Sequence, residues 1–190
     1  MQEKIIYVIS GCNGAGKTTA SYTLLPEILD CKVFVNADEI AKGLSPFEPE
    51  SVAFEAGRIM LERIAQLIKE GKTFSLETTL STKSYKGIFQ KAINSGYQVH
   101  LLYFWLNSSD LAVKRVKARV KEGGRNIPKD VIKRRYVRGL DNLFNIYVSL
   151  SSKVYLFDNS NDEVALLAQG IFGFQEIYDE KIWQKIVRKS

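Results

Sequence analysis

The feature that most constrains the fold of this sequence is a glycine-rich segment near its amino end. Residues 11–18 read GCNGAGKT and satisfy the pattern G-x-x-x-x-G-K-[ST]. An apolar, β-branched run at residues 4–10 precedes the segment, and a helical pattern from residue 17 to about 29 follows it. A strand, a glycine turn and a helix in this order predict a loop whose backbone N–H groups converge on phosphate oxygens.

This phosphate loop predicts a nucleotide site. The Lys17 amine is expected to reach the β- and γ-phosphates of ATP, and the Thr18 hydroxyl is expected to hold Mg²⁺. The residues expected to bind the nucleotide are Gly11, Asn13, Gly14, Ala15, Gly16, Lys17, Thr18 and Thr19.

The rest of the chain alternates between strand and helix patterns. Strands are predicted at residues 4–10, 32–35, 73–76, 97–106 and 153–157. Helices are predicted at 17–29, 50–70, 85–94 and 109–122 and from Pro128 onward, with one or two weaker helices at the carboxyl end. The pattern favours one α/β domain over residues 1–190, a three-layer P-loop NTPase fold with a mostly parallel five-stranded sheet. The strand at 97–106 is almost continuously apolar and is expected to be central.

Polar residues follow the predicted strands, at the edge where open α/β sheets bind ligands. Asp38 is the best candidate for a general base that accepts the proton of an alcohol; its alternative role is a helix N-cap. Glu77 has two candidate functions, an outer-sphere contact to Mg²⁺ or an anchor for a substrate hydroxyl, and its alternative is a capping or surface carboxylate. Thr78 and Thr79 are candidates to bind substrate or to turn the chain.

Positive charge is concentrated in one segment. The chain has a net charge of +6, and residues 114–138 alone carry eleven Lys and Arg against two acidic residues, a local net charge of +9. Such a segment fits a solvated helix face, a nucleic-acid patch or a cluster that closes over phosphates.

Two glycines inside this segment favour the third interpretation. Gly123 and Gly124 form a natural hinge for a helical lid over about residues 109–149. Arg119 and Arg125 flank the hinge and are the predicted catalytic arginines, with Arg115 as a substitute, because guanidinium groups stabilise a transferring phosphoryl group. The other cations, including Lys129, Lys133 and Arg134, are interpreted as solvated helix residues.

The single histidine and the two cysteines are expected to have structural roles, and the cysteine count also bears on the cellular compartment. His100 alternates within its predicted strand and is expected in the core. Cys12 and Cys31 are predicted to be neither nucleophiles nor ligands, and so few cysteines suit a reducing compartment. No signal-peptide pattern and no apolar run near the roughly 20 residues of a membrane span are found, so we expect a cytoplasmic protein without membrane contact.

Four segments together resemble the zeta-toxin family of P-loop kinases. They are SGCNGAGKTT, FVNADEIAKGLSP, FSLETTLS and GGRNIPKDVIKRRYVRGLDNLFNIY, in the family's order and approximate spacing, and the similarity covers about residues 4–159. The resemblance implies an ATP-dependent kinase of a toxin–antitoxin system that phosphorylates a small molecule such as UDP-N-acetylglucosamine. It implies that Lys17 and Thr18 serve ATP and metal, Asp38 is the base, Glu77 and Thr79 bind substrate, and Arg119 and Arg125 contact the transferring phosphate. Where many short relatives carry histidine before Asn-Ile-Pro, this chain has Arg125.

Other functions remain open at this point. Within enzymes, the alternatives are a small-molecule, nucleotide or polynucleotide kinase without toxic activity. Outside enzymes, they are a nucleotide-dependent switch or a transporter-type ATPase, although no LSGGQ-like signature is present. A nucleic-acid partner is not expected.

Overall fold

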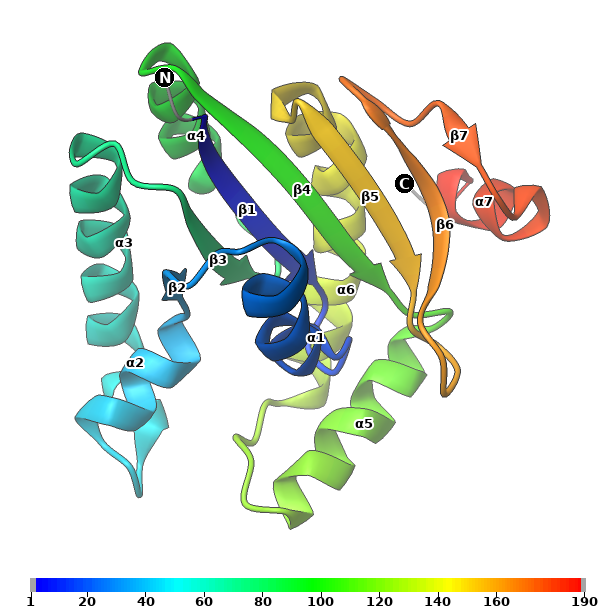
Figure 1. Ribbon diagram of the computed structural model, residues 1–190. Helices are drawn as coiled ribbons and strands as arrows, with labels where there is room; N and C mark the ends of the chain where they lie inside the picture. Colours follow the sequence, from blue (N-terminus) through cyan, green and yellow to red (C-terminus); the bar gives the residue numbers. More distant parts are fainter. Residues whose placement is uncertain (1–2, 189–190) are drawn as a thin grey trace.

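A computed structural model describes residues 3–188, which build a three-layer α/β fold around one seven-stranded sheet (Figure 1). The strand order is β2-β3-β1-β4-β5-β6-β7, and β1 to β5 pair in parallel. The strands are β1 (Lys4–Gly11), β2 (Phe34–Val35), β3 (Phe74–Thr78), β4 (Tyr97–Trp105), β5 (Lys153–Asp158), β6 (Ala165–Ile171) and β7 (Glu176–Ile177). The five predicted strands are thus confirmed, with β4 at the centre.

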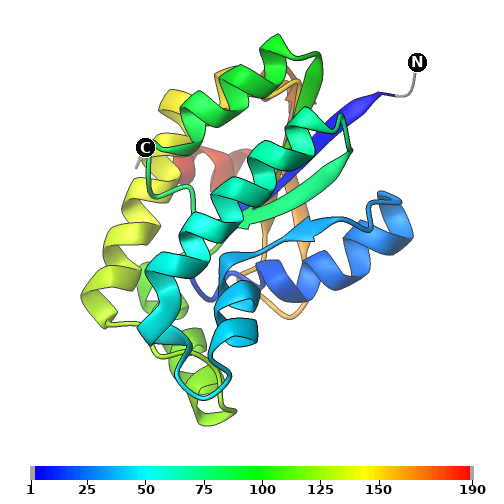
Figure 2. The same cartoon turned by 90° about the vertical axis from the view of Figure 1, so that its left-hand side faces the viewer.

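Helices cover both faces of the sheet. They are α1 (Lys17–Thr23), α2 (Ala37–Leu44), α3 (Ala53–Lys69), α4 (Tyr85–Asn94), α5 (Ser109–Lys121), α6 (Lys129–Asn142) and α7 (Glu180–Val187). Short π- or 3₁₀-helical turns adjoin them at Leu24–Ile28, Pro49–Val52, Leu143–Tyr147 and Val148–Leu150. Figure 2, viewed from the β2 edge, shows α3 lying across the sheet.

The alternating side chains of the strands feed two separate apolar clusters, one on each face. Ile6 and Val8 of β1 pack with residues of α3, α4 and the end of α6, whereas Tyr7 and Ile9 pack with α1, α5 and the start of α6. The helix α6 therefore contributes to both clusters. This double burial explains why the parallel strands are nearly continuous apolar runs.

The carboxyl end differs from the prediction, because residues 165–177 form strands β6 and β7 instead of helix. β6 pairs antiparallel with β5, and β7 pairs antiparallel with β6, so the sheet has seven strands rather than five. Only α7 fulfils the expectation of a carboxyl-terminal helix. The open edge of β5 decides the outcome, since pairing with an existing strand outweighs the weak local propensity of the segment.

His100 confirms its predicted place in the core. It lies on β4, buried, with its ring edge-on to Tyr7 at 5.4 Å and its Nε2 atom 3.2 Å from the side-chain oxygen of Gln98. Burial lowers the pKa of His100 to about 4, and Lys153 on β5 adds to the effect. The neutral ring is a structural element of the sheet.

Within residues 3–188, no helix combines the length and the apolar character needed to cross a membrane.

Candidate active site

The phosphate loop joins β1 to α1 in a conformation that requires glycine. Gly14 and Gly16 have φ angles of 80° and 78°, a region that residues with side chains rarely adopt. A Cβ atom on Gly14 would lie only 2.9 Å from the carbonyl oxygen of Ala112 on α5. The side-chain amide of Asn159, just after β5, donates to the carbonyl oxygen of Ala15 at 2.8 Å. The loop is thereby held between two elements distant in sequence.

Lys17 is the buried cation of this loop. Only 6% of its side chain is exposed. Its Nζ donates to the carbonyl oxygen of Cys12 at 3.1 Å and lies 3.6 Å from Oε1 of Glu77. The charge is therefore kept at the mouth of the loop by an opposite charge, which is what a buried lysine requires.

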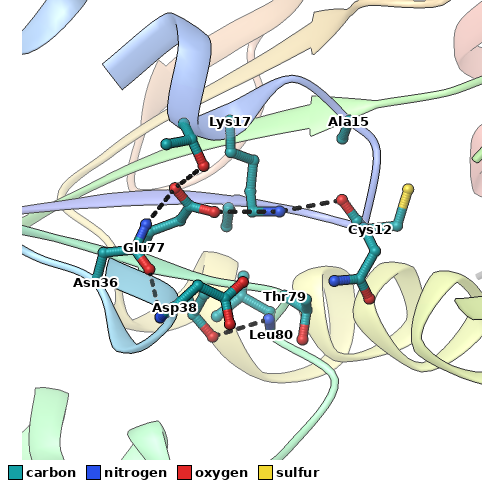
Figure 3. A network of polar contacts seen from close by, with 12 residues as sticks. Cys12, Ala15, Lys17, Asn36, Asp38, Glu77, Thr79 and Leu80 are labelled. Carbon is teal, nitrogen blue, oxygen red and sulfur yellow. Dashed lines mark hydrogen bonds and ion pairs between the residues drawn. The ribbon is translucent and has the colours of Figure 1, made fainter. Parts of the chain in front are cut away.

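Glu77 is the centre of a buried polar network at the end of β3 (Figure 3). Its Oε2 accepts hydrogen bonds from the Thr18 hydroxyl at 2.7 Å and from the Asn36 amide at 3.0 Å, and 10% of its side chain is exposed. It is therefore neither a helix cap nor a surface carboxylate. Thr18, the predicted metal ligand, already points its hydroxyl at this carboxylate.

Asn36 links the two candidate carboxylates, a function that the sequence analysis missed. It is the N-cap of α2, and its side-chain oxygen accepts a hydrogen bond from the backbone N–H of Asp38 at 2.8 Å while its amide donates to Glu77. The alternative interpretation of Asp38 as the cap is wrong, because Asn36 has that position. An asparagine immediately before a helical pattern is a recognised N-cap signal and would have identified it.

The main cavity, of about 430 Å³, brings the predicted base and the predicted substrate-binding residues together. Asp38, Glu77 and Thr79 line it along with Lys17 and Asn13 of the phosphate loop. The Thr79 hydroxyl is 2.8 Å from that of Ser81, which also lines the cavity. Thr78 also lines the cavity, and its hydroxyl accepts a hydrogen bond from the backbone N–H of Leu80, which helps to turn the chain.

A smaller cavity, of about 130 Å³, lies against the phosphate loop itself. Thr18, Thr19, Arg115 and Arg119 line it, so Arg119 faces the loop as predicted for a phosphate contact. Arg115 lines the same cavity, and its Nη1 donates to the carbonyl oxygen of Asn159 at 2.6 Å. Both the predicted arginine and its substitute therefore lie at the phosphate loop.

The basic segment is divided by residue type. All six of its arginines line one of the two cavities just described, and none of its five lysines does; the arginines are Arg115, Arg119, Arg125, Arg134, Arg135 and Arg138. Arg134 is a solvated helix residue, 51% exposed, that also lines the main cavity, whereas Lys133 forms a surface pair with Asp110 at 2.8 Å. Arginine is the residue suited to phosphate recognition, so residue type was an available signal.

Arg135 and Arg138 are cavity residues that the sequence analysis did not single out. The Nη1 atom of Arg135 donates to the side-chain oxygen of Asn13 at 3.2 Å, which ties α6 to the phosphate loop. Burial lowers the pKa of Arg135, and the nearby charge of Arg125 adds to this effect. Five cations of the main cavity thus face two carboxylates, and the surplus positive charge favours an anionic ligand.

Close packing against the end of β3 fixes the position of α6. A Cβ atom on Gly139 would lie 2.6 Å from the carbonyl oxygen of Thr79. The side-chain amide of Asn142 donates to the carbonyl oxygen of Leu80 at 2.8 Å, and the Tyr147 hydroxyl donates to that of Thr82 at 2.6 Å. The arginines of α6 therefore project from a helix that is docked along the threonine-rich wall of the cavity.

Arg125 extends from the loop between α5 and α6 to Asp38. Its Nη1 donates to Oδ1 of Asp38 at 2.6 Å, and its Nε lies 4.0 Å from Oε1 of Glu50. The structure therefore brings these two predicted catalytic residues together as an ion pair.

The residues present fit a nucleotide with Mg²⁺. The glycine loop, the buried Lys17 amine and the Thr18 hydroxyl supply the donors and the ligand expected of such a site. Among residues 3–188 no group of three or more His, Cys, Asp or Glu side chains could hold a metal ion by itself. A single protein ligand is consistent with Mg²⁺ that arrives with phosphates and keeps several waters.

Cys12, within the phosphate loop, is not a reactive thiol. Burial raises the pKa of the Cys12 thiol to about 11, so this cysteine stays protonated.

Solved structures share this fold. One chain of the AvrRxo1-ORF1:AvrRxo1-ORF2 complex with sulphate ions is 20% identical, with a TM-score of 0.77 over 97% of this chain. This chain spans only 63% of that chain. A chain of the PezAT chromosomal toxin–antitoxin system of Streptococcus pneumoniae is 18% identical, with a TM-score of 0.68 over 99% of this chain and 86% of that one.

Sequence comparison gives the family. An uncharacterized protein of Haemophilus influenzae is 34% identical over 136 residues, which cover 72% of this chain and 94% of that protein. The sequence profile named Zeta toxin matches residues 1–170, from the phosphate loop through all the cavity residues described above. The chain therefore belongs to the Zeta toxin family of P-loop kinases.

Proposed function

We propose that this protein is an ATP-dependent phosphotransferase that moves the γ-phosphate of ATP to a hydroxyl of a small anionic acceptor. The observation that carries the proposal is one cavity lined by the Lys17 amine, the Asp38 carboxylate and four arginines. Phosphoryl transfer to an alcohol needs a cation for the phosphates and a carboxylate for the proton of the hydroxyl. ATP as the donor is supported by the AvrRxo1 complex, which was solved with ATP.

The phosphate loop, residues 11–19, would bind the triphosphate through its backbone N–H groups and through Lys17. The Thr18 hydroxyl would hold Mg²⁺. Glu77 accepts a hydrogen bond from that hydroxyl and would orient the hydroxyl oxygen toward the ion. When bound, the ion supplies positive charge that offsets the charge developing on the phosphate oxygens.

Asp38 would act as the general base. The acceptor oxygen attacks the γ-phosphorus, its proton passes to the Asp38 carboxylate, and the bond from phosphorus to the bridging oxygen of ADP breaks. Arg119 and Arg135 reach the phosphate loop from α5 and α6 and would stabilise the charge on the transferring group. A loose transition state spreads that charge over three oxygens, which suits two planar donors.

The acceptor is proposed to carry phosphate itself. Arg134 and Arg138 lie one helical turn apart on α6 and line the cavity. A guanidinium group can donate two parallel hydrogen bonds to one phosphate group. Thr79 is the proposed hydrogen-bond partner of the acceptor, whereas Glu77, which contacts Thr18 and Lys17, is assigned to the nucleotide and its metal. A UDP-activated amino sugar such as UDP-N-acetylglucosamine meets these requirements and agrees with the family, so it is the first acceptor to test.

Mass spectrometry tests the proposal directly. The protein is incubated with ATP, Mg²⁺ and either UDP-N-acetylglucosamine or a cell metabolite extract, and a product heavier by one phosphate is expected. Arg138→Gln should raise the acceptor KM about tenfold and leave kcat nearly unchanged, whereas Lys129→Gln, an equal charge loss outside the cavities, should not. The absence of any phosphorylated product across both acceptor sets would refute the phosphotransferase.

The family further supports a cytoplasmic toxin restrained by an antitoxin. Expression of the wild-type chain alone should then arrest growth, and Lys17→Ala should abolish the arrest. Harmless expression of an active enzyme would instead favour a kinase without toxic activity.

A further inference from the structure

Arg125 makes an incomplete set of contacts for a half-buried guanidinium. The side chain is 23% exposed and donates one hydrogen bond, to Asp38. Its Nε is buried and has no hydrogen-bond partner within residues 3–188, because Glu50 at 4.0 Å is too distant. A purely structural arginine would have its donors satisfied. An unsatisfied donor of this kind is what a side chain that changes partners would show.

The same pair forms a wall between two cavities. Arg125 and Asp38 line the main cavity, and both also line a second cavity of about 220 Å³ that extends along Pro46, Phe47 and Gly123. Moving the Arg125 side chain away from Asp38 would join the two spaces. The wall lies where an acceptor hydroxyl must approach the carboxylate.

The position of Arg125 differs from that of the arginines that face the phosphates. Arg119 lines the cavity on the phosphate loop, and Arg135 bonds to Asn13 of that loop. Arg125 does not line the loop cavity, and the donor group that it uses is directed at the base. Its contact thus acts on Asp38 and not on the nucleotide.

We propose that Arg125 is a latch that keeps the Asp38 carboxylate paired, and so occupied as a base, until an acceptor enters. The inference rests on the proposed phosphotransferase function and adds a specificity-determining residue to it. While the latch is closed, the guanidinium occupies one carboxylate oxygen and the space beside it. An acceptor held by the α6 arginines displaces the guanidinium, joins the two cavities and presents its hydroxyl to Asp38. A water molecule has no such second anchor.

The latch has a definite chemical purpose. Without it, a water oxygen attacks the γ-phosphorus, its proton passes to Asp38, the bond to ADP breaks and phosphate is lost. Excluding this side reaction is a general requirement of kinases, and coupling the active geometry to the correct substrate is one way to meet it.

The test is ATP hydrolysis in the absence of any acceptor. Arg125→Gln should raise the rate about tenfold, a fraction of what a general base contributes. Arg125→Lys should restore most of the suppression, and Arg125→Gln combined with Asp38→Asn should return the rate to the wild-type level or lower. Lys121→Gln, an equal charge loss on α5 outside the cavities, should stay within about twofold of wild type. An unchanged or reduced rate in Arg125→Gln overturns the latch, and a reduction of about a hundredfold or more would assign Arg125 to the transition state instead.

Hydrogen exchange gives a readout that does not depend on catalysis. The pair ties residues 122–128 to the start of α2, so Arg125→Gln should speed amide exchange in both segments, and Lys121→Gln should not. Equal exchange in wild type and Arg125→Gln would refute the latch even if the protein transfers phosphate. Conversely, faster exchange in a protein that neither hydrolyses ATP nor phosphorylates any acceptor would refute the proposed function and leave the contact standing.

Discussion

Two carboxylates face the same cavity, yet their surroundings differ. Glu77 is 10% exposed and contacts Thr18, Asn36 and Lys17 at once, whereas Asp38 is 41% exposed and has Arg125 as its ion-pair partner. The nucleotide half, built around Glu77 and Lys17, is already paired, because a buried charge without partners is costly. In the acceptor half, the Asp38 carboxylate is partly exposed and pairs with Arg125. Under the proposed function, the nucleotide half would hold its ligand in a fixed geometry, and the acceptor half would admit its ligand by exchanging one contact.

The largest effect should come from the exposed carboxylate. Asp38→Asn should lower the rate of transfer by about 10²–10⁴-fold, because the amide cannot take the proton of the acceptor. Nucleotide affinity, measured by calorimetry, should change by less than about twofold. Glu39→Gln, the neighbouring acid on α2, serves as the control, and equal losses in both variants would contradict the difference drawn between the two halves.

A somewhat smaller loss of transfer activity is expected when the cation of the nucleotide half, Lys17, is removed. Lys17→Ala should reduce transfer by about 10²–10³-fold and weaken nucleotide binding, since it removes a donor aimed at the transferring group. It also leaves Glu77 buried without its cation, so the midpoint of thermal unfolding should fall. Lys117→Ala, at an exposed position on α5 outside the three cavities, should change neither quantity. Retention of nucleotide affinity in Lys17→Ala would refute the assignment.

Glu77→Gln separates the two functions proposed for this residue. Removing the charge while keeping the shape should weaken binding of the Mg²⁺–nucleotide about tenfold and leave the acceptor KM unchanged, because the carboxylate contacts Thr18 and Lys17. Steady-state kinetics with each substrate varied in turn gives the answer. A rise in the acceptor KM alone would make Glu77 a substrate anchor and not a part of the nucleotide half.

The smallest effect on transfer should come from His100, which lies outside both halves. Its folded pKa of about 4 is below the ordinary 6.5, so the unfolded chain binds the proton first as the pH falls. The free energy of unfolding should therefore be at its full value above pH 6.5 and decrease toward pH 4, by up to about 3 kcal/mol. His100→Phe should lose less stability over this range and keep its transfer rate near neutral pH. Parallel stability curves for the two proteins would contradict the assignment of the buried neutral ring.

The sequence predicted the fold where short-range patterns decide it. The phosphate loop between β1 and α1 followed from glycine spacing, and β4 was placed centrally because its apolar run is unbroken. Strands β6 and β7 were missed, because their formation depends on the free edge of β5 and not on a local pattern. An edge strand of this kind can be assigned only when the strand that it pairs with is known.

The prediction of the site has the same limit. Asp38 and Glu77 were found because each follows a strand, and Arg119 because it flanks a glycine pair. The partners of these side chains could not be predicted: Arg125 and Asp38 are 87 positions apart, and Arg135 and Asn13 are 122 apart. Only the packing of α6 against the sheet decides which arginine meets which group. Two local clues were left unused: residue type within the basic segment and the N-cap signal at Asn36.

Gly139 sets the width of the main cavity. Because hydrogen is the only substituent that fits between α6 and the carbonyl oxygen of Thr79, any larger residue there must push the helix outward, and Arg134, Arg135 and Arg138 move with it. The width of the proposed acceptor site is thus set from a position that does not line the cavity. A methyl group at residue 139 would act as a spacer, and the acceptors that then fit would differ in size while they keep the same chemical groups.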